Sequence, residues 1–229
     1  MKETLEIIDF LREHSNPSNV KGMARFGITT AQAFGVPLPI LRLKAKSYKK
    51  NHSLAMELWE SGYHEARIMA TMTDDYKQVT KIQMEQWVQD FDSWDICDQC
   101  CSNLFDKTAF AIQKSIEWTT RPEEFVKRAG FTLMACLAVH AKKMDNRQFL
   151  EFLPLIVRES TDDRNFVRKA VNWALRQIGK RNIQLREEAL AVAQKLMLSE
   201  NKAARWIGTD ASKELLNEKI INRIKSKEK

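Results

Sequence analysis

Apolar residues recur at helical spacing along nearly the whole chain, and few residues interrupt that pattern. Only seven glycines and five prolines occur among 229 residues. Leu54, Leu58 and Trp59 fall on one helix face, for example, and Ser61 and Gly62 follow as a stop signal. The pattern predicts an all-α protein.

Polar or proline-containing breaks divide the chain into helices. We place such breaks at residues 15–18, 35–39 and 90–92. We expect Thr161, Asp162 and Asp163 to start a long helix that runs through Gly179, with acidic side chains near its positive end. Residues 224–229 are expected to form a frayed, charged end.

The helices come in pairs that resemble one another. Each pair has an outer helix, a short polar turn and an inner helix that opens with a basic residue, as in residues 58–70, 116–129 and 156–170, with a weaker copy at 203–207. Irregular spacing of about 30 to 47 residues is typical of helical-pair repeats of the HEAT kind. We therefore expect residues 1–229 to form a single domain, a right-handed α-solenoid of HEAT-like helical pairs.

One position can be matched across the repeats. It is occupied by Arg67, Asp98, Arg128, Lys169 and Arg205, which are separated by 31, 30, 41 and 36 residues. Four of the five are cationic, and the chain carries a net charge of +7. A polyanionic partner is favoured, and the concave groove of the solenoid is expected to be basic. The alternatives are a basic but indifferent surface and a set of unrelated first-turn residues.

Asp98 is the exception in this cationic row, and Trp94 lies one helical turn before it. Residues at i and i+4 share a helix face, so a carboxylate stands beside a large flat ring. A positive charge that develops on a bound substrate would explain an acid kept there. The alternatives are a core role for Trp94, a structural salt bridge between Asp98 and Arg128, and a helix-capping role without chemistry for the neighbouring Asp95. Trp59, Trp87 and Trp118 are assigned to helix packing.

Other classes of site are disfavoured. Cys97, Cys100, Cys101 and Cys136 lack a second pair at metal-ligand spacing, so we expect these thiols to pack as small apolar groups. The histidines form no cluster with a nucleophile, and we expect no metal and no cofactor. No stretch approaches the ~20 apolar residues of a membrane span, and the first residues lack the apolar core of a signal peptide. We expect a cytoplasmic protein that does not bind a membrane.

Four segments carry a specific resemblance. They are Met-Ala-Arg-Phe-Gly-Ile at 23–28, Ser-Trp-Asp-Ile-Cys-Asp at 93–98, Val-Lys-Arg-Ala at 126–129 and Asn-Phe-Val-Arg-Lys-Ala-Val-Asn-Trp-Ala-Leu-Arg at 165–176. In this order they resemble the DNA alkylation repair family, the AlkD-type HEAT-like-repeat alkylpurine DNA glycosylases. The resemblance runs from about residue 20 to about residue 215 and so covers most of the chain.

The resemblance implies a function and a site. Members of that family grip duplex DNA on a concave α-solenoid face and release positively charged N3- and N7-alkylated purines, such as 3-methyladenine and 7-methylguanine, without drawing the base into a pocket. It places the catalytic aspartate at Asp98, its flanking tryptophans at Trp94 and Trp173, and a phosphate-contacting arginine at Arg128. The expected partner is double-stranded DNA containing alkylated purines, bound by a monomer near the nucleoid. Further expected DNA contacts are Phe26, Arg67, Lys127, Arg168, Lys169, Lys180, Arg181 and Arg205.

The chain also departs from that family's pattern. Phe26 stands where a tyrosine follows Met-Ala-Arg, and Ser93 stands where a second tryptophan precedes Trp94. Both changes put substrate range and rate in doubt. Two alternatives stay open: a non-catalytic protein that binds damaged or branched DNA, and a HEAT-type scaffold for protein interactions. Arg176, Lys180 and Arg181 can also be read as a solvated helix end.

Overall fold

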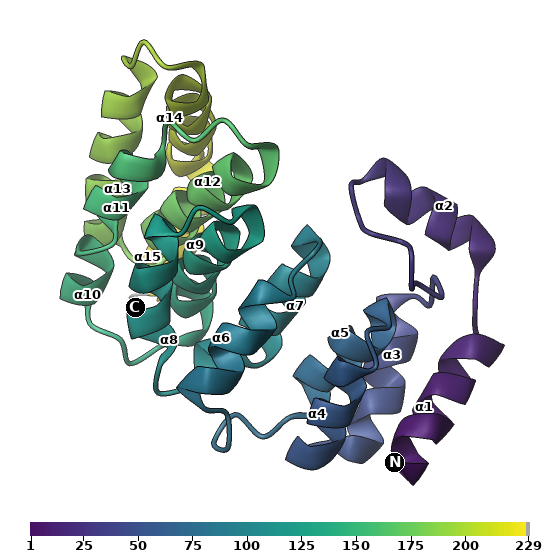
Figure 1. The fold of residues 1–229 in the computed structure, drawn as a ribbon. Helices are drawn as coiled ribbons and strands as arrows, with labels where there is room; N and C mark the ends of the chain where they lie inside the picture. The colour runs from purple at the N-terminus through teal and green to yellow at the C-terminus, as the bar shows by residue number, and fades with distance from the viewer. Residues whose placement is uncertain (228–229) are drawn as a thin grey trace. The chain divides into compact units, whose positions relative to one another are not determined.

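The computed structural model describes residues 1–227, which contain fifteen α-helices, three 3₁₀ helices and no strand. The all-α prediction is confirmed (Figure 1). Packing divides the chain into two compact units, Met1–Thr108 and Ala109 onward. The single domain expected over residues 1–229, the right-handed course and the basic groove stay predictions.

The first unit contains seven α-helices, and three of them begin at a residue whose side chain caps them. Asn16, Asn51 and Thr80 accept hydrogen bonds from backbone N–H groups in the first turns of α2, α4 and α6. The predicted breaks at 15–18, 35–39, 61–62 and 90–92 all separate or end helices. The helices are α1 (Lys2–Glu13), α2 (Pro17–Arg25), α3 (Leu38–Ala45), α4 (His52–Glu60), α5 (His64–Thr73), α6 (Lys81–Gln89) and α7 (Trp94–Asn103), with 3₁₀ helices η1 (Lys46–Tyr48) and η2 (Phe105–Lys107).

Aromatic packing fills the middle of this unit. Trp59 and Trp87 stack with ring centroids 4.0 Å apart, and both are buried. Because their apolar area is removed from water, these rings contribute to the stability of the unit in proportion to the area they bury. The assignment of Trp59 and Trp87 to packing is confirmed. The four cysteines are buried too, as expected of small apolar groups.

A buried carboxylate holds the segment between α2 and α3. Glu65, the second residue of α5, is 1% exposed and accepts hydrogen bonds from the backbone N–H groups of Phe34, Gly35 and Val36. Gly35 has a φ of +77°, and a Cβ there would lie 2.4 Å from the Asn16 carbonyl oxygen. The segment is therefore fixed by main-chain bonds to one acidic side chain.

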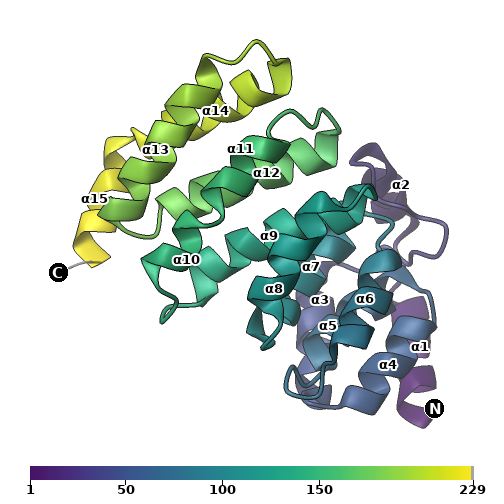
Figure 2. The same cartoon turned by 60° about the vertical axis from the view of Figure 1, so that its left-hand side comes forward.

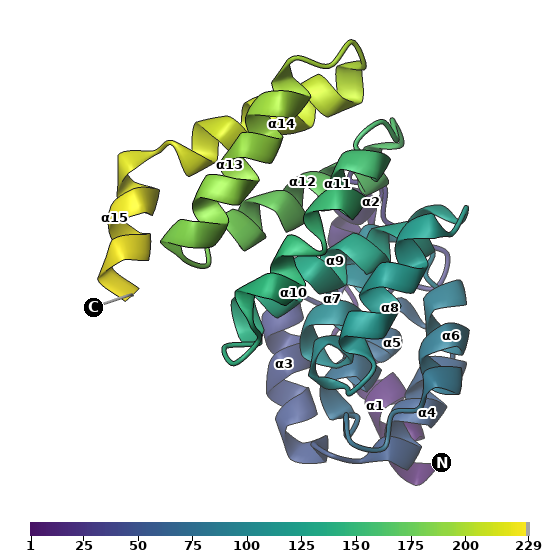
Figure 3. The ribbon, with the colours of Figure 1, turned by 90° about the vertical axis from the view of Figure 1, so that its left-hand side faces the viewer.

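The second unit is built from paired helices. In Figures 2 and 3, α13 lies beside α14, and α12 contacts α9, α13 and α14. The outer and inner helices predicted for the later repeats are found here as α8 with α9, α11 with α12 and α13 with α14. The helices are α8 (Ala111–Glu117), α9 (Glu124–His140), α10 (Asn146–Leu150), α11 (Leu153–Glu159), α12 (Asn165–Gly179), α13 (Ile183–Met197), α14 (Lys202–Leu215) and α15 (Glu218–Lys227), with the 3₁₀ helix η3 (Trp118–Thr120).

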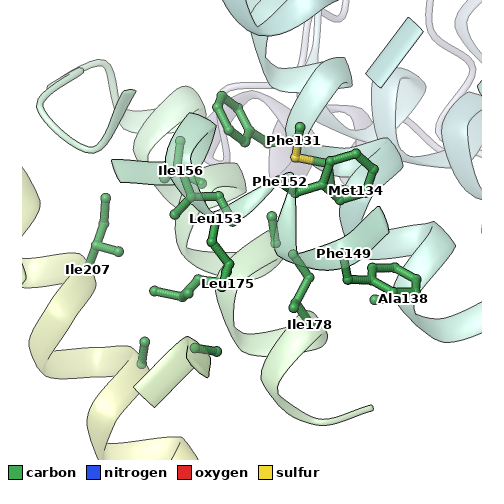
Figure 4. Packing of buried hydrophobic residues seen from close by; sticks show 14 of the residues in the cluster. Phe131, Met134, Ala138, Phe149, Phe152, Leu153, Ile156, Leu175, Ile178 and Ile207 are labelled. Atoms are coloured by element: carbon green, nitrogen blue, oxygen red, sulfur yellow. The ribbon is translucent and has the colours of Figure 1, made fainter. Parts of the chain in front are cut away.

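One apolar cluster forms the core of the second unit. Figure 4 shows part of it, with side chains supplied by α9, α12 and α14 among others. Trp118, predicted to pack, is fully buried. At Gly208 the helices approach so closely that a Cβ would lie 2.5 Å from the carbonyl oxygen of Ala193. Close backbone contact between α13 and α14 thus depends on this glycine.

Two predicted helix ends need correction. The long helix begins at Asn165 rather than at residues 161–163, because the Asp162 carboxylate bonds to the backbone and guanidinium of Arg164 instead of capping the helix. Its predicted end at Gly179 is confirmed. Of the end expected to fray, residues 224–227 continue helix α15, and 228–229 lie outside the described residues.

Candidate functional site

Helix α7 carries the first part of the candidate site. It begins at Trp94 after an extended, fully buried Ser93. Asp95 stabilises this start: one carboxylate oxygen accepts from the Ser93 hydroxyl at 2.8 Å and from the Ile96 N–H at 3.0 Å. The capping role foreseen as an alternative for Asp95 therefore agrees with its contacts.

The other Asp95 oxygen lies 2.8 Å from Nε2 of His64, the first residue of α5. Burial of the imidazole opposes its protonation, but the hydrogen bond and charge of Asp95 outweigh that effect, so the pKa of His64 is raised. Burial also opposes ionisation of Asp95, and the hydrogen bond and charge of His64 again outweigh it, so the pKa of Asp95 is lowered. The pair thus favours an ionised, hydrogen-bonded contact between α5 and α7.

Trp94 differs from the tryptophans of the core. It is only half-buried, whereas Trp59, Trp87 and Trp118 are at most 2% exposed. Its indole Nε1–H donates to the backbone carbonyl oxygen of Phe26 at 3.0 Å. The ring is thereby oriented without being enclosed.

Asp98 follows Trp94 by one turn of the same continuous helix and is also half-buried. The two side chains share one face of α7, as the i, i+4 spacing predicts. Phe26, also expected at the site, is 70% exposed just after α2. The structure therefore brings Trp94 to the backbone of Phe26, with Asp98 one turn further along α7.

A cavity of about 480 Å³ borders Trp94 in this unit. It is lined by residues of α2, the segment leading to α3, α5 and α7, including Phe26, Glu65, Trp94 and Asp95. Its walls are largely apolar side chains such as Met23, Ile28, Leu38 and Ile68.

Arg67, the remaining candidate of the first unit, is engaged within it. Its guanidinium lies 5.3 Å from the Trp59 ring centroid and donates to the Asp90 carbonyl oxygen at 3.2 Å. The Asp90 carboxylate is 3.8 Å away. Arg67 therefore braces α4 and α5 against the end of α6.

In the second unit, Arg128 and Lys127 open α9. Arg128 is 5% exposed and donates to the Phe166 carbonyl oxygen at 2.7 Å, which ties the start of α12 to α9. Lys127 lies 2.6 Å from a Glu159 carboxylate oxygen and 3.4 Å from one of Asp162. The charge of Lys127 is thus balanced inside the protein.

Helices α12 and α14 carry the next group of candidates. Lys169 is exposed, has no ion pair among residues 1–227, and shares a face of α12 with the half-buried Trp173 four residues later. The Arg168 guanidinium lies 4.7 Å from the ring centroid of Trp206. Arg205 is exposed and donates to the carbonyl oxygens of residues 199 and 200.

Lys180 and Arg181 lie past the other end of α12, about 17 Å along the helix axis from Lys169 at 1.5 Å per residue. Lys180 pairs with Glu214, and Arg176 pairs with both Asp210 and Glu214. The Arg181 guanidinium donates to four backbone carbonyl groups at residues 138–144, and burial lowers its pKa. These side chains do not form a freely solvated helix end, because they pair with carboxylates or donate hydrogen bonds to backbone carbonyl oxygens.

The positions matched across the repeats lie near the starts of their helices, but they differ by one residue in register. Arg67 and Arg205 are the fourth residues of α5 and α14, and Asp98, Arg128 and Lys169 are the fifth residues of α7, α9 and α12. Two residues near this set were missed by sequence reasoning. His64 was set aside for want of a nucleophile, and Trp206 was read only as part of a repeat. A histidine at the start of a helix gives no indication in the sequence that it bonds to a carboxylate 31 residues away.

Two further properties bear on the class of site. Within residues 1–227, no three His, Cys, Asp or Glu side chains gather in a way that could hold a metal ion. No helix in that range combines the length and apolar character needed to cross a bilayer.

Comparison with known proteins places the chain. A model of the family described as DNA alkylation repair enzyme matches residues 7–215. A solved structure, described as a new family of proteins related to the HEAT-like repeat DNA glycosylases with affinity for branched DNA structures, is similar with a TM-score of 0.76 and 17% identity, covering 92% of this chain and 94% of that chain. Comparison with curated protein sequences finds no match. The structural likeness shows a HEAT-like repeat fold, and by the family match this chain belongs to the DNA alkylation repair enzyme family.

Proposed function

We propose that this protein is a monofunctional DNA glycosylase that hydrolyses the N-glycosidic bond of positively charged alkylated purines, such as 3-methyladenine and 7-methylguanine, in duplex DNA. The observation that carries the proposal is the shared, half-exposed face of Trp94 and Asp98 on α7. The family resemblance assigns the chemistry to Asp98, and Asp95, the other carboxylate of this turn, is bonded to His64 and Ser93.

The substrate's own charge sets what the protein must supply. An N3- or N7-alkylated purine leaves with the electron pair of the C1′–N bond and needs no general acid. Oxocarbenium character develops on the deoxyribose, and the Asp98 carboxylate stabilises it. Water then attacks C1′, and Asp98 accepts a proton from it as a general base. The reaction follows the electrostatic logic of glycoside hydrolysis with one carboxylate.

The other candidate residues hold the DNA. We assign Trp94 and Trp173 to contacts with the sugar and the cationic base, each contributing about 0.5–2 kcal/mol when desolvated. Arg128 and Lys169 are assigned to phosphate groups, where they give affinity that falls with salt but carries no sequence preference. Arg168 and Arg205, at the same ends of α12 and α14, are further backbone contacts in this proposal.

A second candidate is a protein that binds branched or damaged DNA without excising a base. Two observations favour it. The similar solved structure is described by affinity for branched DNA structures. Ser93 and Phe26 also depart from the glycosylase pattern.

Single-turnover release of 7-methylguanine from a defined duplex separates the candidates. The native protein is compared with Asp98→Asn and with Asp92→Asn, a matched control at an exposed carboxylate just before α7. Release by the native protein and by Asp92→Asn, lost in Asp98→Asn with DNA affinity retained, supports the glycosylase.

The other outcomes point elsewhere. Salt-sensitive binding of duplex or four-way-junction DNA without release favours the binding protein, and neither activity nor DNA binding favours a scaffold for protein interactions. A covalent DNA adduct trapped by borohydride would overturn the hydrolytic mechanism, because hydrolysis by water forms no Schiff base with lysine.

A further inference from the structure

Two adjacent residues at the start of α5 hydrogen-bond to two segments near Trp94. His64 reaches Asp95 at the start of α7, and Glu65 holds the backbone of residues 34–36. The backbone N–H of His64 also donates to the Gln32 carbonyl oxygen at 2.9 Å. The start of α5 therefore holds two segments. One is the start of α7, and the other begins at Phe26, whose carbonyl oxygen accepts from the Trp94 indole N–H.

We propose that His64 and Asp95 are positioning residues, which fix the first turn of α7 so that the Trp94 ring and the Asp98 carboxylate hold one orientation for the reaction. The inference rests on the proposed function and deepens it. Neither residue is assigned to touch the substrate.

The geometry of the first turn explains why this contact matters. The Ser93 side chain makes no bond to the backbone N–H groups of α7, and its hydroxyl donates to Asp95 instead. At this end of α7, Asp95 bonds to Ser93, to the Ile96 N–H and to His64 of α5. Since Trp94 and Asp98 are the first and fifth residues of α7, unwinding one turn would displace the ring and alter the direction of the carboxylate together.

The surroundings of His64 leave Asp95 as its hydrogen-bond partner among the described residues. His64 is 4% exposed, and its Nδ1 is buried without a partner. In the ionised pair both ring nitrogens carry a hydrogen, and Nε2 donates its hydrogen to Asp95. The charged groups that face the imidazole are Asp95, Glu65 and Asp92, and Arg67 lines the small cavity of about 260 Å³ beside it. The hydrogen bond of the His64 side chain thus holds the start of α7.

A second His–Asp hydrogen bond in the first unit serves as a control, although burial raises the pKa of its carboxylate, Asp74. His52 Nδ1 lies 2.7 Å from a buried Asp74 carboxylate oxygen in the same unit. This pair joins the start of α4 to the residue that follows α5. A general loss of stability from breaking a His–Asp pair would appear in His52→Ala as well as in His64→Ala. Only a positioning role predicts an effect confined to His64 and Asp95.

The first readout is the indole ¹H–¹⁵N resonance of Trp94 by NMR, identified by its loss in Trp94→Phe. We expect His64→Ala and Asp95→Ala to shift or broaden this resonance and to leave that of the buried Trp118 unchanged. We expect His52→Ala to leave the Trp94 resonance in place. An unmoved Trp94 resonance in both His64 and Asp95 variants, or an equal shift in His52→Ala, overturns the proposal.

The second readout is single-turnover base release. Positioning predicts a rate at least tenfold lower in His64→Ala and Asp95→Ala, with the DNA dissociation constant within threefold of native and His52→Ala close to native in both. Asp95→Asn keeps an acceptor for His64 and should recover part of the rate, and it replaces Asp95→Ala should that variant fail to fold. If the native protein releases no base, the glycosylase proposal fails while the NMR result still decides the positioning of Trp94.

Discussion

Replacing Glu65 by glutamine should loosen the segment between α2 and α3 by a calculable amount. One carboxylate oxygen accepts from Gly35 at 2.6 Å and Val36 at 3.3 Å, and the other accepts from Phe34 at 2.9 Å. In Glu65→Gln one of these oxygens becomes an NH₂ group, which faces an N–H donor. One backbone donor then loses its acceptor, at about 1–3 kcal/mol, and the remaining bonds lose their ionic character, so we expect a total near 3 kcal/mol.

Amide hydrogen exchange measures this loss at the residues concerned. Because each 1.4 kcal/mol of opening free energy changes exchange tenfold, the amides of residues 34–36 should exchange about a hundredfold faster in Glu65→Gln. Glu60→Gln, at an exposed carboxylate ending α4, is the matched control and should leave them at native rates. Exchange at residues 34–36 within threefold of native in Glu65→Gln would refute the reasoning.

Three other outcomes can be checked by unfolding and binding measurements. Gly208→Ala should lower the denaturant-derived free energy of unfolding by about 1–3 kcal/mol, because its methyl group would meet the Ala193 carbonyl oxygen at 2.5 Å. Arg181→Gln should cost about 2 kcal/mol through lost bonds to carbonyl groups, yet leave the salt dependence of DNA binding unchanged in a titration series. Asp95→Asn should destabilise most between about pH 4 and 6.5 in urea unfolding followed against pH: the native pair loses stabilisation as pH falls through the lowered pKa of Asp95, and as it rises through the raised pKa of His64.

Helix content and several helix ends could be predicted from the sequence, because they depend on neighbours in the chain. Apolar spacing located α4, and Ser61 and Gly62 marked its end. The start of α12 was wrong because residues 161–163 look like a helix cap, while Asp162 binds Arg164 and Lys127 instead. A capping pattern gives no sign that a cation elsewhere in the fold competes for the same carboxylate.

The candidate site was predicted in the same uneven way. The shared face of Trp94 and Asp98 follows from spacing within one helix and is found in the structure. Whether a basic side chain forms an ion pair does not follow from spacing, because its partner is distant in sequence. Lys127 meets Glu159 and Lys180 meets Glu214, 32 and 34 residues away. Two of the expected DNA contacts are therefore paired with acidic side chains that the sequence did not indicate.

The indole of Trp94 is anchored to the main chain at residue 26 rather than to a side chain. Every amino acid supplies the same carbonyl oxygen, so the anchor is independent of which residue occupies that position. The Phe26 ring, which is 70% exposed, takes no part in this hydrogen bond. A substitution at position 26 would therefore change the exposed surface while leaving the anchor of Trp94 in place.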